Sequence, residues 1–164
     1  MEKFSDSNCL NCDDELLKKF KLFADLSDEE LHTLVSQSGR DQHPAGTKII
    51  SAGESGFCMY VILRGKVAVT TESAGRKVEL AEMGPGEFFG EVSLVDDGPR
   101  SADVTLLEDS EFLVITRMTL GILAGLQPGA AIHILAAIGR GLVARLRDGN
   151  QKYMDLIVLS RQLA

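Results

Sequence analysis

The sequence is short of cysteine and histidine, with three of each among its 164 residues. A small, odd number of cysteines does not support a disulfide framework. The start, Met1 to Asp6, lacks the apolar run of a secretory signal. The most apolar region, 120–138, is interrupted by Gln127 and Pro128, and it falls short of the ~18 uninterrupted apolar residues of a membrane span. We therefore expect a soluble cytoplasmic protein with no membrane partner.

The chain also has fewer basic than acidic residues. Seventeen Lys and Arg stand against twenty-four Asp and Glu, which leaves a formal net charge of −7. An acidic chain without a long basic run is repelled by nucleic acid, so no DNA binding is expected of this chain. With 45% hydrophobic and 25% charged residues the chain has enough apolar material for a core. Its length fits one domain, or one domain plus an extension.

The residues needed for catalysis are not grouped. His32, His43 and His133 fall in different parts of the chain, whereas a metal-dependent enzyme built on a barrel needs several converging histidines. Ser93 and Ser101 have no histidine at a recognisable spacing, so no nucleophile–base pair is predicted. The sequence predicts a protein that is not an enzyme and that holds no catalytic metal.

Cys9-x-x-Cys12 is the one pattern that suggests a metal or redox role. A four-ligand site needs two more ligands, and only Cys58 remains, inside a predicted strand. We therefore favour a flexible N-terminus over residues 1–12 and keep a Cys-based redox or metal sensor as an alternative. Cys58 itself is interpreted as a small core hydrophobe.

Residues 13–37 have a helical pattern. Ser27 is a suitable N-cap, and Glu30, three residues later, completes a capping box. We predict two short helices, roughly 13–22 and 28–37. The apolar positions behind this prediction recur at steps of three to five residues: Leu16, Leu17, Phe20, Phe23, Leu26, Leu31 and Leu34.

Between Gly39 and Arg117 the apolar period changes to two, and this stretch holds ten of the sixteen glycines. Residues 73–76, Ser-Ala-Gly-Arg, predict a hairpin turn. Many short strands at this spacing predict an antiparallel jelly roll, so the fold class is α+β but mainly β, a double-stranded β-helix or β-roll. The predicted strands are Thr47–Ile50, Phe57–Leu63, Lys66–Thr71, Arg76–Met83, Ala102–Leu107 and Glu111–Thr116.

The rest of the chain, 118–164, is helical again, and Pro128 suits the first turn of a long last helix. Gly139, Gly141 and Gly149 each weaken an isolated helix by ~1 kcal/mol, so this helix needs a packing partner. The partner is either the roll or a second copy of the chain, and a homodimer is favoured. We divide the chain into the N-terminus, a roll with its leading helices at 13–127, and a helix at 128–164. The stripe that resembles a coiled-coil seam is Leu135, Ile138, Leu142, Leu146, Gly149, Tyr153 and Leu156.

Residues 88–104 read Phe-Phe-Gly-Glu-Val-Ser-Leu-Val-Asp-Asp-Gly-Pro-Arg-Ser-Ala-Asp-Val. Gly90 to Leu94 predicts one helical turn inserted between strands, with backbone amides facing outward. Arg100 follows a turn at Gly98-Pro99, where its guanidinium can clamp a phosphate and Ser101 can add a hydroxyl donor. Glu91 would accept from neutral donors such as ribose hydroxyls. These features fit a nucleotide with a single phosphate.

This segment resembles the phosphate-binding cassette of the cyclic-nucleotide-binding domain, a family that includes the catabolite activator proteins, the regulatory subunits of protein kinase A and the cyclic-nucleotide-gated channels. The resemblance covers roughly residues 13–160. It includes Leu17-x-x-Phe20-x-x-Phe23-x-x-Leu26-Ser27, Gly53, Tyr60-Val61-Ile62-x-x-Gly65-x-Val67 and Gly84-x-Gly86.

The resemblance implies a role for each residue of the cassette. Gly90 and Glu91, followed by Val92, would meet the ribose, and Arg100 would pair with the cyclic phosphate. Ser101 and the backbone amide of Ala102 would complete the phosphate cradle, and Leu80 would line the purine side. The implied ligand is cyclic AMP, with cyclic GMP as the alternative. The last helix would cover the ligand or form a dimer seam, and would pass the signal to an effector protein that is not identified.

The sequence also departs from the family in one respect and leaves two questions open. The family's transcription factors continue into a winged helix-turn-helix, whereas this chain stops shortly after its long helix, so DNA binding is not carried over. Arg140 and Arg145 could approach the base or lie in solvent. The alternative function is a β-roll interaction domain that binds no nucleotide, in which Glu91 and Arg100 form only an internal ion pair.

Overall fold

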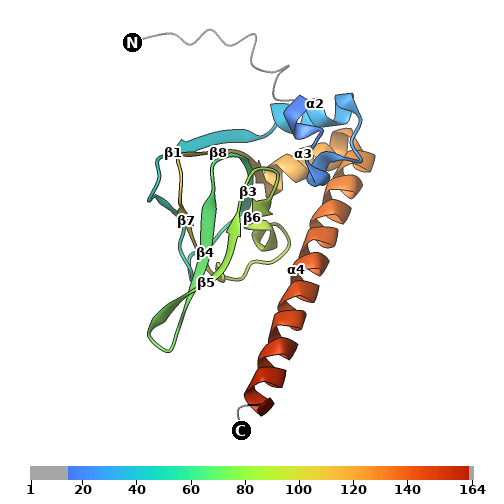
Figure 1. Ribbon diagram of the computed structural model, residues 1–164. Helices are drawn as coiled ribbons and strands as arrows, with labels where there is room; N and C mark the ends of the chain where they lie inside the picture. Colours follow the sequence, from blue (N-terminus) through green and yellow to red (C-terminus); the bar gives the residue numbers. More distant parts are fainter. Residues whose placement is uncertain (1–14, 163–164) are drawn as a thin grey trace.

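A computed structural model describes residues 15–162. Two four-stranded antiparallel sheets form a roll, with short helices at one end and a long helix running beside it (Figure 1). One sheet has the order β1-β8-β3-β6 and the other β2-β7-β4-β5. The strands are β1 (Gly39–His43), β2 (Lys48–Ile50), β3 (Cys58–Arg64), β4 (Val67–Ser73), β5 (Arg76–Met83), β6 (Phe88–Phe89), β7 (Asp103–Leu106) and β8 (Ser110–Thr116). The helices are η1 (Lys21–Phe23), α2 (Asp28–Ser36), η2 (Glu91–Leu94), α3 (Arg117–Leu126) and α4 (Pro128–Gln162).

The N-terminal helices are confirmed in part. Ser27 Oγ accepts from the Glu30 amide at 3.3 Å, and the Glu30 carboxylate accepts from the Ser27 amide at 2.8 Å, so the capping box of α2 is present. The prediction of one helix over 13–22 is wrong. Within the described part of it, a helical turn covers only 15–17, and the 3-10 turn η1 follows. Phe20 has an extended backbone, which lets Leu22 and Phe23 both turn into the core.

All six predicted strands are present, within one or two residues at each end. The hairpin at 73–76 is also confirmed, because Ser73 pairs with Arg76 and the two residues between them have positive φ, 51° at Ala74 and 71° at Gly75. The prediction missed β1 and β6. β1 is a polar edge strand without apolar alternation, and β6 is only two residues long.

The core has two parts. One fills the roll, where Tyr60 stacks on Phe89 at 5.2 Å between ring centroids and both rings meet Phe112 edge-on. The other lies between the roll and the helices and includes Phe88 of β6. The paired residues Phe88 and Phe89 therefore face opposite cores, which fixes the chain just before Gly90 on both sides.

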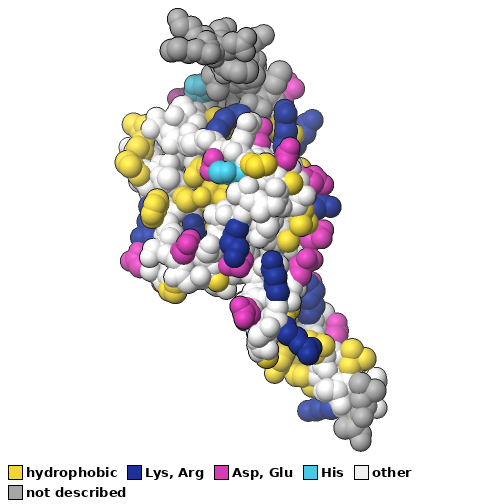
Figure 2. All heavy atoms as spheres, turned by 90° about the vertical axis from the view of Figure 1, so that its left-hand side faces the viewer, with side chains coloured by type: hydrophobic (Ala, Val, Ile, Leu, Met, Phe, Trp, Pro, Cys, Tyr) yellow, Lys and Arg dark blue, Asp and Glu magenta, His cyan; other side chains and the backbone are white. Residues whose placement is uncertain are grey.

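The first half of α4 packs on the rest of the molecule through small and branched side chains, namely Ala130, Ala131, Ile134, Ala137 and Ile138. The packed face therefore differs from the predicted stripe, of which Ile138 is buried and Leu142 half-buried, while Leu135, Leu146, Tyr153 and Leu156 are exposed. From Val143 to Gln162 every residue except Ile157 is exposed, and this part of α4 projects below the roll (Figure 2). By length and composition alone, α4 is apolar enough to cross a membrane.

Gly141 is the point where α4 comes closest to β6. A Cβ placed on Gly141 would lie 2.6 Å from Phe88 Cζ, which is inside van der Waals contact, whereas a Cβ on Gly139 would meet nothing within 4 Å. The backbone of α4 therefore needs a residue without a side chain at position 141 to reach the roll.

Gly141→Ala is expected to lower the melting temperature by about 2–4 °C, because overpacking typically costs ~1–3 kcal/mol and exceeds the ~1 kcal/mol gained in helix propensity. The matched variant Gly139→Ala is expected to raise the melting temperature, since it gains the same propensity without a clash. Thermal unfolding followed by circular dichroism measures both. Equal stabilisation by the two substitutions would contradict the close approach of α4 to Phe88.

Candidate functional site

The turn predicted after β6 is present as η2, and Gly90 begins it in the left-handed region with φ of 79°. A Cβ at this position would lie 2.7 Å from Arg100 Nη1 and 3.1 Å from the Cys58 carbonyl oxygen. Glycine is therefore required here twice, once for its backbone conformation and once for the space that it leaves to the arginine.

Arg100 is held by backbone carbonyl oxygens. Its Nη1 donates to the Gly90 oxygen and its Nη2 to the Cys58 oxygen, both at 2.9 Å. On the other side a Cβ at Gly56 would lie only 2.1 Å from Arg100 Nε. Glycines at positions 56 and 90 thus frame a slot for the guanidinium, and within residues 15–162 no carboxylate forms an ion pair with it.

The loop that carries Arg100 is tied to the loop before β3. The Arg100 amide donates to the Glu54 oxygen, and the Gly53 amide donates to the Arg100 oxygen, each at 2.8 Å. Two backbone hydrogen bonds therefore fix the backbone of Arg100 beside the loop before β3. From there its side chain extends to the carbonyl oxygens of Cys58 and Gly90. The predicted turn at Gly98-Pro99 brings the chain to this point.

A cavity of about 180 Å³ opens next to the guanidinium. Of the predicted site residues, Arg100 alone lines it. The others lining it are Ile49, Ile50, Glu54, Ser55, Gly56, Phe57, Cys58 and Tyr60. The cavity therefore presents one cation, Arg100, and one acid, Glu54, among mainly apolar and small side chains.

Two residues of this cavity were missed or misread from the sequence. Cys58 is half-buried rather than part of the core, and its Sγ lies 3.8 Å from Arg100 Nη2. Burial, together with the neighbouring Cys58, raises the pKa of the Tyr60 phenol well above its usual range, so Tyr60 stays neutral beside the arginine. The alternation of a strand places residues 58 and 60 on one face, but the sequence does not show that this face borders a cavity.

Glu91 lies apart from Arg100 and has a different partner. Its side chain is only 6% exposed, and its Oε1 is 2.8 Å from Nη1 of Arg145 on α4. The alternative reading, an internal Glu91–Arg100 ion pair, is therefore wrong. Arg140, the other arginine left open by the sequence, pairs instead with Asp25 at 2.7 Å. Sequence reasoning could not find the Arg145 contact because it depends on where α4 crosses η2.

The remaining predicted site residues do not line the cavity. Val92 is 49% exposed on η2, Ser101 is exposed and Ala102 is half-buried. Leu80 is exposed on β5, which is buried only at its last residue. The structure therefore brings Gly90 and Arg100 into direct contact, leaves Val92, Ser101 and Leu80 exposed, and half-buries Ala102.

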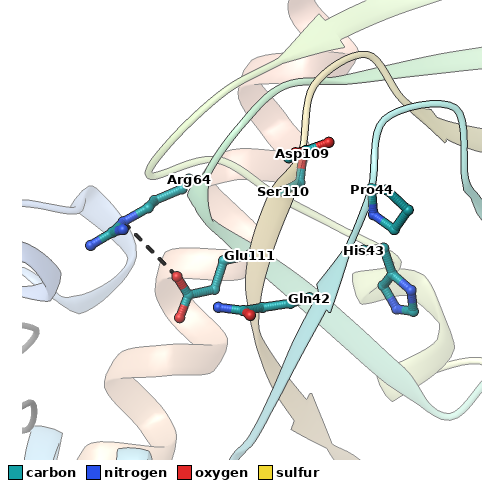
Figure 3. A pocket seen from close by; sticks show the side chains of 7 residues that line it. All are labelled: Gln42, His43, Pro44, Arg64, Asp109, Ser110 and Glu111. Atoms are coloured by element: carbon teal, nitrogen blue, oxygen red, sulfur yellow. Dashed lines mark ion pairs between the residues drawn. The ribbon is translucent and has the colours of Figure 1, made fainter.

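A larger hollow of about 420 Å³ lies elsewhere on the roll, along β1 and the start of β8. Figure 3 shows its side chains spread over an open surface, with Arg64 directed toward Glu111 and with His43 and Pro44 on the opposite side. None of the predicted site residues lines it. Over the part of the chain that the structure describes, no group of three or more His, Cys, Asp and Glu is placed to hold a metal ion, and Cys9 and Cys12 lie outside that part.

The region around Arg100 lies in a part of the chain that resembles known proteins. Residues 40–125, just over half of the chain, match the family model of the cyclic nucleotide-binding domain. A cyclic AMP receptor protein from Thermus thermophilus is 37% identical over 142 residues, which cover 86% of this chain and 63% of the relative. A cAMP-dependent protein kinase regulatory subunit from Debaryomyces hansenii is 33% identical over 95 residues, 58% of this chain and 20% of the relative.

The fold has close counterparts among solved structures. The crystal structure of a cyclic nucleotide-binding domain from Methylobacillus flagellatus superimposes with a TM-score of 0.77 at 29% identity, covering 85% of this chain and 79% of the other. This likeness confirms the predicted β-roll with N-terminal helices and a long C-terminal helix. The chain spans less than two thirds of the length of the bacterial receptor protein that it matches.

Proposed function

Because the chain belongs to the cyclic nucleotide-binding domain family, we propose that it is a non-enzymatic regulatory module that binds cyclic AMP in the cavity beside Arg100. One observation carries this proposal. Arg100 is fixed by two carbonyl oxygens, lies at the edge of a cavity and has no carboxylate partner among the described residues. A fixed guanidinium with unused N–H donors is suited to binding a phosphate.

The neighbouring groups supply the rest of the recognition. Ser101 is exposed directly after Arg100 and can donate its hydroxyl to a phosphate oxygen, together with the Ala102 amide. Glu91 is the only acid of η2 and would accept from ribose hydroxyls once Arg145 moves away from it. Cyclic AMP is chosen over cyclic GMP because the receptor protein and the kinase subunit that resemble this chain are named for cyclic AMP.

Binding would be transmitted through the helices that touch η2. Arg117, the first residue of α3, donates from Nε to the Ser93 oxygen at 2.7 Å and from Nη2 to the Asp96 oxygen at 2.8 Å. Arg145 holds the other end of η2 from α4. A ligand that shifts η2 therefore acts on both helices, and it changes their equilibrium by as much as its affinity differs between the two positions.

The exposed part of α4 is proposed as the seam of a cytoplasmic homodimer. A row of exposed apolar side chains of this length normally marks an interaction surface, and its three-four spacing suits a second identical helix. The exposed apolar residues of α4 are Ile132, Leu135, Val143, Leu146, Tyr153, Met154, Leu156, Val158 and Leu159. Effector proteins that read the ligand state would contact the same projecting helix.

Cyclic AMP at a hundred times its dissociation constant is expected to stabilise the protein by ~2.7 kcal/mol, which raises the melting temperature by about 5–11 °C for a chain of this size. Arg100→Ala is expected to abolish most of this shift, because it removes the charge-assisted contact to the phosphate. Thermal melts with and without cyclic AMP and cyclic GMP measure the effect.

Arg64→Ala is the matched control, since Arg64 belongs to the larger hollow and is expected to leave the shift unchanged. A well-folded protein that shows no shift with either nucleotide would support the interaction domain that binds no nucleotide. An undiminished shift in Arg100→Ala would remove Arg100 from the binding site.

The double variant Leu146→Glu/Tyr153→Glu is expected to convert the dimer to a monomer, because it places charges at two positions of the seam that are 64% and 65% exposed. Light scattering coupled to size-exclusion chromatography gives the mass. Leu126→Glu, on α3 and equally exposed at 64%, serves as the control and should leave the dimer intact. A wild-type protein that is monomeric at high concentration would disprove the dimer.

A further inference from the structure

Arg145 forms an ion pair with Glu91, the residue that we propose binds the ribose hydroxyls. Its Nη1 lies 2.8 Å from Glu91 Oε1, its Nη2 donates to the Phe88 carbonyl oxygen, and its guanidinium sits 4.8 Å from the centroid of the Phe88 ring. These are three separate contacts from one side chain of α4 to the segment that precedes and begins η2. Arg145 and Glu91 are 54 positions apart in the sequence.

Glu91 is consequently closed to a ligand in this arrangement. Its side chain is 6% exposed, and it does not line the cavity beside Arg100. A buried carboxylate needs a compensating partner, and a ribose hydroxyl is a neutral donor that replaces a guanidinium only in part. The ribose and Arg145 thus compete for one carboxylate, and the 40% exposed Arg145 is the partner that can move to solvent.

Among the described residues, the Arg145–Glu91 ion pair is also the one between α4 and the roll that lies furthest along α4. Gly141, one turn earlier, brings the helix backbone against Phe88. Beyond Arg145, the ion pair of α4 joins Lys152 to Asp148 within the helix, and the residues from Leu146 to Gln162 are exposed except Ile157. Within residues 15–162, the hydrogen bonds from the projecting half of α4 to the segment that precedes and begins η2 all come from Arg145.

We propose that Arg145 is a latch that couples the nucleotide site to α4. When it is closed, the ion pair with Glu91 holds α4 against η2 and lowers the affinity for cyclic nucleotide. When a ribose hydroxyl donates to the Glu91 carboxylate, Arg145 loses its ion pair with Glu91. The projecting part of α4 is then no longer held against η2. Arg145 acts through Glu91 and is a positioning residue rather than part of the binding surface. This inference rests on the proposed function, and it predicts that removing Arg145 strengthens binding, since the fraction of molecules with an accessible site rises.

The test compares cyclic AMP affinity and association rate in the full chain by calorimetry and stopped-flow fluorescence. Arg145→Gln is expected to bind about fivefold or more tightly than wild type and to associate faster, as for a typical allosteric coupling. Arg145→Lys keeps the charge and is expected to restore most of the wild-type behaviour. Arg147→Gln, two residues further along the exposed part of α4, is expected to change neither quantity.

The possible outcomes separate the latch from the proposed function. If wild type binds cyclic AMP and Arg145→Gln binds equally or more weakly, the latch is overturned while the nucleotide site stands. If neither binds any cyclic nucleotide although both unfold cooperatively, the proposed function is wrong and the latch with it. Arg145→Met, which keeps an apolar stem over Phe88, replaces Arg145→Gln if the latter fails to fold, and the same outcomes apply.

Discussion

The slot around Arg100 is the constraint on which the rest of the site depends. A guanidinium can lie between β3 and the start of η2 only because positions 56 and 90 carry no side chain, where a Cβ would come within 2.1 Å and 2.7 Å of it. The carbonyl oxygens of Cys58 and Gly90 then hold it without neutralising its charge. Pairing with a carboxylate would have satisfied the arginine electrostatically and removed its ability to attract a phosphate. Backbone carbonyls fix its position and leave the charge available.

The second constraint is the close approach of α4 to β6. Small and branched residues line the packed face of α4, and Gly141 lets its backbone reach Phe88. This approach brings Arg145 to Glu91, and Arg117 holds the other end of the same short turn from α3. One four-residue turn is thus attached to Arg100 through Gly90 and to both C-terminal helices through arginines. A module that reports a bound nucleotide requires this kind of physical link between its site and its exposed helix.

The sequence predicted most of the fold because its local signals agree with one another. The capping box at Ser27 and Glu30, the hairpin at residues 73–76 and Pro128 at the start of α4 each have a short-range physical cause that survives in the structure. The errors arose where tertiary contacts decide. The first helix is broken at Phe20 so that Leu22 and Phe23 can be buried, and β1 is held by pairing with β8 rather than by its own pattern.

Of the predicted site residues only Arg100 lines the cavity, and the partners of the charged side chains were not predictable from the sequence. The spacing of Gly90, Glu91 and Arg100 identified the cassette, and the structure places Gly90 against Arg100. The partner of Glu91 comes from a helix more than fifty residues away, and the half-buried position of Cys58 depends on a cavity that no sequence pattern shows. Contacts between distant segments are set by the packing of whole elements, which is why the sequence left the position of Arg145 open and wrongly placed Cys58 in the core.

A crystal structure of the protein with cyclic AMP would show where the phosphate binds. We expect the cyclic phosphate at the Arg100 guanidinium, with oxygens at about 2.7–2.9 Å from its nitrogens, as in charge-assisted hydrogen bonds. Cyclic AMP bound with its phosphate away from Arg100, for example in the hollow near Arg64 and Glu111, would rule out Arg100 as the phosphate-binding residue.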